Sequence, residues 1–237
     1  MPETPFYVSL KNRATLHISG EDAKSFLQDL ITNDMNKIES DKPLYACLLN
    51  PQGKFLFDFF IYQSEQDDKA FILDCEAGEN AERINALYKK LLMYRLRKAV
   101  DITMQEHAQI YAIFGAPEIG LADPRHTEMG TRSFDKPNIS EANFEEWDQR
   151  RIKLTIPDGS RDLIVDKSTM DEAHMDQLNA IDYKKGCYVG QELTARMHYR
   201  GLGKKHLQSV KLSELPEGAM LRSSCGDIGL ALVKNKA

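Results

Sequence analysis

The chain has 237 residues, of which 42% are hydrophobic and 28% are charged, and its formal net charge at neutral pH is −5. This composition is typical of a globular protein that is long enough to bury a sizeable core, in one large domain or in two or three small ones. No stretch approaches the roughly 18 consecutive apolar residues of a membrane-spanning helix, so the sequence argues against one.

The N-terminal residues and the cysteines bear on the cellular compartment. Residues 1–14 have neither the apolar centre of a signal peptide nor the acid-poor, arginine-rich composition of a transit peptide. The four cysteines, Cys47, Cys75, Cys187 and Cys225, are far apart and form no CxxC pair, which argues against a zinc knuckle or a dithiol motif. These features favour a reducing compartment, and we expect a cytoplasmic protein.

The first half of the chain predicts strands that alternate with two amphipathic helices. Ser19 and Asp22 resemble a capping box, which predicts that a helix follows the first strand. Proline and glycine in the turn at 50–53 predict a hairpin between two apolar runs. The expected elements are a strand at 14–18, a helix at 23–31, hairpin strands at 44–49 and 54–62, a strand at 69–75, a helix at 81–92 and a strand at 99–104. They add up to an α+β sheet with helices on one face.

The second half of the chain is less regular. A strand is expected at 109–115, and a long irregular connection at 116–140, where Gly, Pro, Asp and Thr are frequent. Phe144, Trp147 and Arg151 recur at helical spacing and predict a helix before Pro157. Three short strands are expected at the C-terminus, at 206–212, 219–223 and 228–234.

The stretch KKGCYVGQELTARMHYRG, from Lys184 to Gly201, carries the clearest chemical pattern. Apolar and charged residues recur every four positions on two different faces, which predicts a helix beginning near Gly190. Cys187 then lies before the helix N-terminus and beside two lysines, a setting that lowers the pKa of a thiol. We therefore expect Cys187 to be partly thiolate at neutral pH. The alternative is that Cys187 is a small buried hydrophobic residue and that the glycines only permit a tight turn.

One reactive cysteine does not define a reaction. No Ser/His/Asp order, glycine-rich phosphate loop or metal-ligand spacing accompanies it, so no metal ligands are predicted. Residues 184–237 carry a net charge of +6, whereas the rest of the chain is acidic. That segment has few aromatic residues for base stacking, so direct nucleic-acid binding is the least supported function.

The residues Lys185 to Glu192, KGCYVGQE, resemble the K-G-C-[YF]-x-G-Q-E signature of YgfZ-type proteins. These are folate-binding relatives of the glycine-cleavage T-protein, an aminomethyltransferase, and they include the iron–sulfur assembly branch. Weaker similarity extends over nearly the whole chain, at 18–35, 45–62, 94–102 and 192–201. The ELTAR run that begins at Glu192 is closer to the iron–sulfur branch than to the T-protein.

The resemblance implies the fold and its division into parts. It implies an α+β, T-protein-like arrangement of small domains around a central folate cavity, with a shortened β-barrel-like segment at the C-terminus. Residues 1–200 would form the T-protein-like folate-binding region, as two intertwined α+β subdomains of which the second spans roughly 36–105. Residues 201–237 would form the truncated C-terminal β domain.

The resemblance also implies functional residues. The motif contributes the predicted catalytic group, which comprises Lys185, Cys187, Gln191 and Glu192. The predicted folate contacts are Arg13, Tyr45, Asp58, Trp147 and Glu172. Trp147 offers a flat face for stacking and Arg13 a cation for the glutamyl carboxylates, the alternatives being a core tryptophan and a surface arginine.

The preferred function is a tetrahydrofolate-binding factor that assists assembly or repair of iron–sulfur clusters in client enzymes, including tRNA-modifying radical enzymes. Its partners would be iron–sulfur assembly proteins and those clients. Cys187 would either hold a cluster or a persulfide transiently or take part in redox chemistry with the folate, and the sequence does not choose between these roles. The first alternative is a folate-dependent aminomethyltransferase. T-proteins carry an Asp-Asp pair where this chain has Phe57-Asp58, so a true aminomethyltransferase is not expected. The second alternative is a non-catalytic scaffold that needs no folate.

Overall fold

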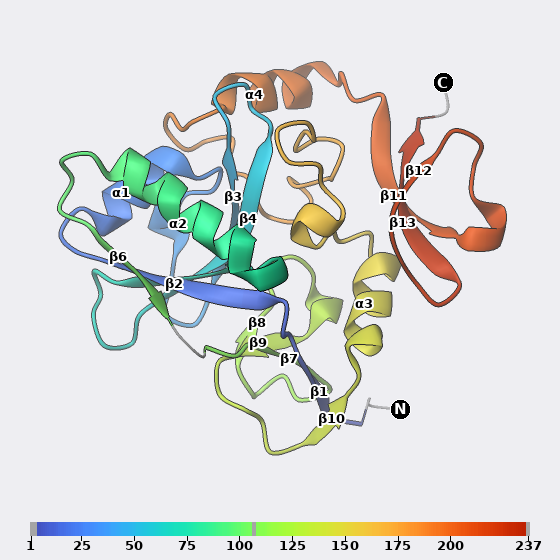
Figure 1. Cartoon of the computed structure of the whole chain (residues 1–237), viewed down its shortest axis with the longest axis horizontal. Coiled ribbons are helices and arrows are strands. Elements are labelled where there is room, and N and C mark those ends of the chain that lie inside the picture. The colour runs from blue at the N-terminus through green and yellow to red at the C-terminus, as the bar shows by residue number, and fades with distance from the viewer. Residues whose placement is uncertain (1–3, 106–107, 236–237) are drawn as a thin grey trace.

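The computed structural model describes residues 4–105 and 108–235 (Figure 1). These residues form an α+β fold with three β-sheets and four α-helices. The helices are α1 (Ala23–Leu30), α2 (Glu82–Arg95), α3 (Phe144–Lys153) and α4 (Gln191–Arg200). Within the described residues, no helix is both long and apolar enough to span a lipid bilayer.

The first sheet is an antiparallel sheet in the order β3-β4-β5-β2-β6. Its strands are β2 (Arg13–Ser19), β3 (Leu44–Leu49), β4 (Phe55–Gln63), β5 (Phe71–Glu76) and β6 (Asp101–Gln105). Every residue of β3 and eight of the nine residues of β4 are buried, because both faces of these strands are covered. This double burial explains why both strands read as nearly continuous apolar runs rather than alternating ones.

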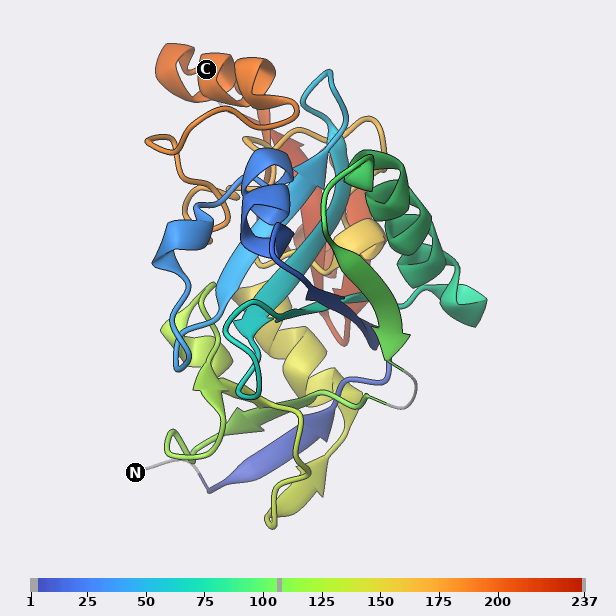
Figure 2. The same cartoon turned by 90° about the vertical axis from the view of Figure 1, so that its left-hand side faces the viewer.

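Helices α1 and α2 cover one face of this sheet (Figures 1 and 2). Their apolar residues recur at helical spacing and pack against alternate residues of the strands. The buried helix residues in this core are Ala23, Phe26, Leu27 and Leu30 of α1 and Ile84, Leu87 and Leu91 of α2. The prediction of helices on one face of an α+β sheet is therefore confirmed.

The second sheet, in the order β10-β1-β7-β9-β8, lies across the other face of the first. Its strands are β1 (Phe6–Ser9), β7 (Tyr111–Phe114), β8 (Leu121–Ala122), β9 (Thr131–Ser133) and β10 (Ser140–Ala142). Strand β1 pairs antiparallel with β7 and parallel with β10. One core joins the two sheets, and it includes Tyr45, Phe60 and Tyr62 of the first sheet and Val8 and Phe114 of the second.

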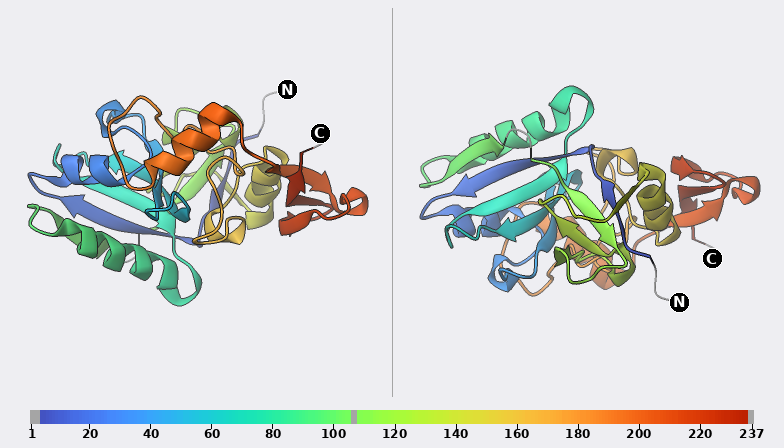
Figure 3. Two further views of the ribbon diagram at one scale, coloured as in Figure 1. Left: turned by 90° about the horizontal axis from the view of Figure 1, so that it is seen from above. Right: turned by 90° about the horizontal axis from the view of Figure 1, so that it is seen from below.

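The third sheet, in the order β11-β13-β12, forms one end of the molecule (Figure 3). Its strands are β11 (Lys205–Lys211), β12 (Met220–Cys225) and β13 (Ile228–Lys234). The prediction of three C-terminal strands is therefore confirmed. Helix α3 packs against β12 and β13, so the sheet joins the body of the protein through that helix. The division of the chain into domains at residue 200 stays a prediction.

Two local predictions are wrong. Ser19 does not cap α1, because it is the last residue of β2 and the helix begins at Ala23 after Asp22. The Asp22 carboxylate instead accepts a hydrogen bond from the backbone N–H of Ala99, at 2.8 Å, and so ties this turn to the segment before β6. The region 116–140 is not wholly irregular, since β8 and β9 form there. These strands have two and three residues, too few to show a period in the sequence.

Candidate functional site

The loop that carries the KGCYVGQE motif packs on the turn of the β3–β4 hairpin, beside α4 (Figures 1 and 2). Gly190 has a φ of 82° and immediately precedes α4, so the predicted helix start is confirmed. A Cβ atom on Gly190 would lie 2.6 Å from the carbonyl oxygen of Asn50 and 2.9 Å from the Cα of Gly53. Gly53 also has a positive φ, of 73°. Two glycines are needed here because the two backbones approach too closely for side chains.

Lys185 anchors the same loop to the end of α1. Its ammonium group donates hydrogen bonds to the carbonyl oxygens of Gln28, Ile31 and Asn33, at 2.7, 2.7 and 2.8 Å. An ammonium group has three N–H donors, so none is left for the thiol of Cys187. Lys185 is only 7% exposed, and burial lowers its pKa to about 8. The structure thus gives this lysine a positioning role in the loop, and its predicted catalytic role stays a prediction.

Cys187 is the one exposed cysteine of the chain. The alternative of a small buried hydrophobic residue is therefore wrong. Cys47 and Cys75 are buried, and burial raises the pKa of both thiols well above the ordinary range. Cys225 is partly exposed on β12, and burial raises the pKa of its thiol as well. Cys187 is consequently the thiol best placed to meet a partner or a metal cluster.

Gln191 and Glu192 form the first turn of α4. The backbone N–H of Gln191 donates to the carbonyl oxygen of Tyr188 at 3.3 Å, which closes a turn directly after Cys187. Gln191 is half-buried and Glu192 is exposed. Both side chains lie on the same end of the helix as the cysteine, and their predicted catalytic roles stay predictions.

Three of the five predicted folate contacts meet in the interior between the first two sheets. The hydroxyl of Tyr45 donates to the carboxylate of Asp58 at 2.7 Å. Nε of Arg13 donates to Asp74 at 2.7 Å, so the alternative of a surface arginine is wrong. Burial raises the pKa of Asp58, although Arg13 and the hydrogen bond from Tyr45 oppose the shift. Sequence reasoning brought the three residues to one place but did not anticipate how deeply they are buried.

Two more arginines and one more aspartate belong to this buried group. Arg132 pairs with Asp74 and lies over the ring of Phe60, with its guanidinium carbon 3.8 Å from the ring centre. Arg125 forms a two-bond pair with Asp123, at 2.8 and 3.0 Å. Burial would raise the pKa of Asp123, but Arg125 and Arg132 hold it below its ordinary value. Sequence reasoning missed these residues: Arg132 and Asp74 are 58 positions apart, and Asp123 and Arg125 lie in a segment read as an irregular connection.

The other two predicted folate contacts lie elsewhere. Trp147 is 1% exposed in the core of α3, where its ring lies 5.2 Å from that of Phe144, so the alternative of a core tryptophan is confirmed. Its indole N–H has no hydrogen-bond partner among the described residues. Glu172 is half-buried, and its backbone carbonyl accepts a hydrogen bond from Leu207 of β11 at 2.7 Å.

The three predicted contacts Arg13, Tyr45 and Asp58 do not fit a bound tetrahydrofolate. A pterin needs open donors and acceptors, whereas Arg13 already donates to Asp74 and the hydroxyl of Tyr45 already donates to Asp58. All three residues are at most 7% exposed. Phe57 lies on the opposite face of β4, in the core beneath α2, and Arg83 lies over its ring at 4.3 Å. The phenylalanine therefore removes no acid from the group around Asp58.

The fold of this chain is similar to that of a glycine-cleavage T-protein. Residues 8–117 match the family model described as the GCVT N-terminal domain. The structure is similar to that of the glycine cleavage system aminomethyltransferase T from Bartonella henselae, with a TM-score of 0.73 over 98% of this chain and 78% of that chain. The two sequences are 12% identical, so this likeness shows the fold alone. The expected T-protein-like α+β fold is confirmed.

The sequence is similar to those of iron–sulfur cluster assembly factors. The chain is 28% identical over 274 residues to the iron-sulfur cluster assembly factor IBA57, mitochondrial, of Homo sapiens, over 94% of this chain and 76% of that protein. It is 29% identical over 259 residues to the iron-sulfur cluster assembly factor IBA57 homolog, mitochondrial, of Coccidioides immitis, over 95% of this chain and 61% of that protein. The chain thus spans about three quarters of the human relative and three fifths of the fungal one.

The expected cytoplasmic location is contradicted by these relatives, whose names place them in mitochondria. That expectation used the composition of residues 1–14 and the spacing of the cysteines. Neither feature determines the compartment, because a reducing environment is not unique to the cytoplasm.

Proposed function

We propose that this protein is an iron–sulfur cluster assembly factor that acts through the thiol of Cys187. The observation that carries the proposal is a single exposed cysteine on a loop whose backbone is fixed on both sides. Lys185 fixes the loop at the end of α1, and Gly190 fixes it against the β3–β4 turn. The names of the similar proteins support the same function.

The chemistry of the loop suits a ligand that is offered to a partner. A thiolate binds iron, but an iron–sulfur cluster takes about four protein ligands, and Cys187 supplies one. Of the other cysteines, Cys47 and Cys75 are buried and Cys225 is partly covered on β12, so we propose that a partner supplies the rest. We propose that the partners are iron–sulfur assembly proteins and client enzymes, tRNA-modifying radical enzymes among them, and that the cluster is cargo rather than a resident cofactor.

Folate has no part in this proposal, because the residues around Asp58 do not fit it. The folate-dependent aminomethyltransferase remains the competing function, since the T-protein-like fold is shared. It is tested by adding tetrahydrofolate and an aminomethyl-lipoyl carrier and measuring methylene-tetrahydrofolate. We expect no turnover, and no saturable change in the fluorescence of Trp147 when tetrahydrofolate is titrated alone. Turnover would support the transferase and contradict our proposal.

The thiol is tested by reconstitution of an apo plant-type [2Fe–2S] ferredoxin with ferrous iron, sulfide and a reducing thiol. We expect the wild-type protein to accelerate the return of the ferredoxin absorbance, and Cys187→Ser to abolish that acceleration. Cys225→Ser is the matched control and should act as the wild type does, because that thiol is partly covered on β12. Full activity of Cys187→Ser would contradict the proposal and favour a scaffold without a reactive thiol.

A further inference from the structure

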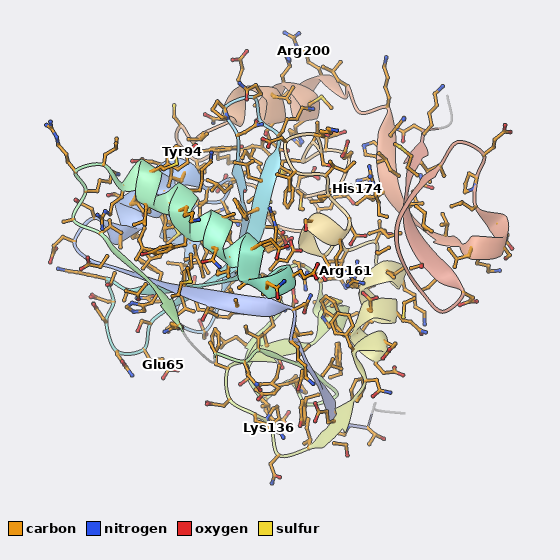
Figure 4. The ribbon with its side chains drawn as sticks, viewed as in Figure 1. Glu65, Tyr94, Lys136, Arg161, His174 and Arg200 are labelled. Atoms are coloured by element: carbon orange, nitrogen blue, oxygen red, sulfur yellow. The ribbon has the colours of Figure 1, made fainter. Side chains whose placement is uncertain are left out.

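Helix α4 and the segments on either side of it carry cations that are not paired. Lys184, Arg196, Arg200, Lys204 and Lys205 are all exposed. Among the described residues none of these side chains forms an ion pair, and Glu192 is the single acid of residues 184–205. Figure 4 shows Arg200 at the outer edge of the molecule above α4. The protein as a whole is acidic, at −5, so this surface differs in sign from the rest of the chain.

The same surface presents apolar side chains to solvent. Tyr199 is 71% exposed and Leu202 is 46% exposed. Below, the name α4 surface denotes Arg196, Tyr199, Arg200, Leu202 and Lys204. Tyrosine and arginine are the residues that most often dominate the binding energy of protein interfaces, and an exposed tyrosine between arginines is typical of such a centre.

Tyr199 is held in place before any partner binds. Its ring meets that of His198 edge-on at 5.0 Å and that of Tyr183 at 6.0 Å. The rings of Tyr183 and His198 stack at 3.8 Å, and His198 lies 3.7 Å from the carboxylate of Asp176. An ordered side chain loses little conformational entropy on binding, so this packing favours association.

The fold by itself explains only part of this surface. Arg200 lies in the last turn of α4, where a cation is stabilised by the helix dipole. Arg196 lies in the middle of the helix, and Lys204 lies beyond its end, so the dipole stabilises neither. Thr194 is the only buried residue of α4, and the helix therefore covers little of the core.

We propose that the α4 surface is the docking surface for an acidic protein partner whose cluster ligands meet Cys187. This inference rests on the proposed function, because the loop with Cys187 leads directly into α4 and the thiol needs further ligands from another protein. Complementary charge would steer the partner to this surface and fix its orientation, while Tyr199 and Leu202 fill apolar contacts at the centre. Nucleic acid is the weaker occupant, because one exposed aromatic residue provides a single stacking platform.

The test measures the affinity of the full-length protein for apo plant-type ferredoxin, a strongly acidic protein with cluster-ligating cysteines. At low salt we expect binding that weakens steeply as salt is added. The double variant R196E/R200E should weaken binding by about tenfold or more, and R196Q/R200Q by less. The matched control is Lys89→Glu on α2, an exposed lysine outside the α4 surface, which should bind as the wild type does. Circular dichroism melts of each variant check that the fold is kept.

Three outcomes would overturn the docking proposal. These are no binding by the wild type at low salt, equal affinity of R196E/R200E and wild type, and tighter binding of poly(U) RNA than of ferredoxin. Cys187→Ser separates this proposal from the proposed function. If it keeps both the affinity and the acceleration of cluster formation, then docking stands and the role of the thiol fails.

Discussion

Replacing Lys185 with methionine tests how the motif loop is held. The side chains have similar length, but methionine cannot donate to the carbonyls of Gln28, Ile31 and Asn33. A buried acceptor without a partner costs at least about 1 kcal/mol, so the variant should lose about 3 kcal/mol of unfolding free energy at pH 7. The matched control is Lys184→Met, because Lys184 is exposed and its side chain has no partner among the described residues.

The pH dependence of this loss follows from the lowered pKa of Lys185, about 8 instead of 10.5. Between these values the unfolded chain binds a proton that the folded chain does not, so wild-type stability gains with rising pH. The gain is at most about 1.4 kcal/mol per pH unit, and the variant lacks it. At pH 9.5 the difference between wild type and Lys185→Met should therefore exceed its value at pH 7 by about 2 kcal/mol.

Urea unfolding at pH 7 and pH 9.5 measures both quantities, with circular dichroism as the signal. Equal midpoints for wild type and variant at pH 7 would refute the anchoring role. A difference that does not grow between pH 7 and pH 9.5 would refute the assigned titration, because it would mean that folding does not lower the pKa of this lysine. The cluster-reconstitution assay adds a functional readout. Lys185→Met, whose loop is loosened, should accelerate reconstitution of the ferredoxin less than the wild type does, whereas Lys184→Met should match the wild type.

Two further substitutions test the contacts that place the loop and fill the interior. Gly190→Ala should destabilise the protein by about 2–4 kcal/mol, because its Cβ would lie 2.6 Å from the Asn50 carbonyl oxygen and the residue has a positive φ. The control is Gly186→Ala, whose Cβ would have nothing within 4 Å and which should be nearly neutral in the same urea titration. Asp74→Asn leaves two buried arginines partly unpaired and should cost about 3–5 kcal/mol by thermal unfolding. A loss below about 1 kcal/mol would mean that water reaches this group.

The local elements could be predicted because their signals are local. The apolar runs on both sides of the turn at 50–53 and the helical spacing at 144–151 each involve residues a few positions apart. The start of α4 near Gly190 and the three C-terminal strands belong to the same class. The capping-box prediction at Ser19 and Asp22 was wrong because the outcome depended on a contact between distant residues. The carboxylate of Asp22 accepts a hydrogen bond from the backbone N–H of Ala99, and a local sequence pattern cannot predict such a distant contact.

The sequence by itself determined the fold class, the boundaries of most elements and the motif that contains Cys187. Only the tertiary structure decided what the charged residues do. Arg13 meets Asp74 across 61 positions, and Lys185 meets the end of α1 across more than 150. Such pairs form because the topology brings their strands and loops together, and burial then requires each charge to find a partner. The local spacing of residues does not predict these pairs, whereas the apolar period of a strand or helix can be seen in residues that are neighbours in the sequence.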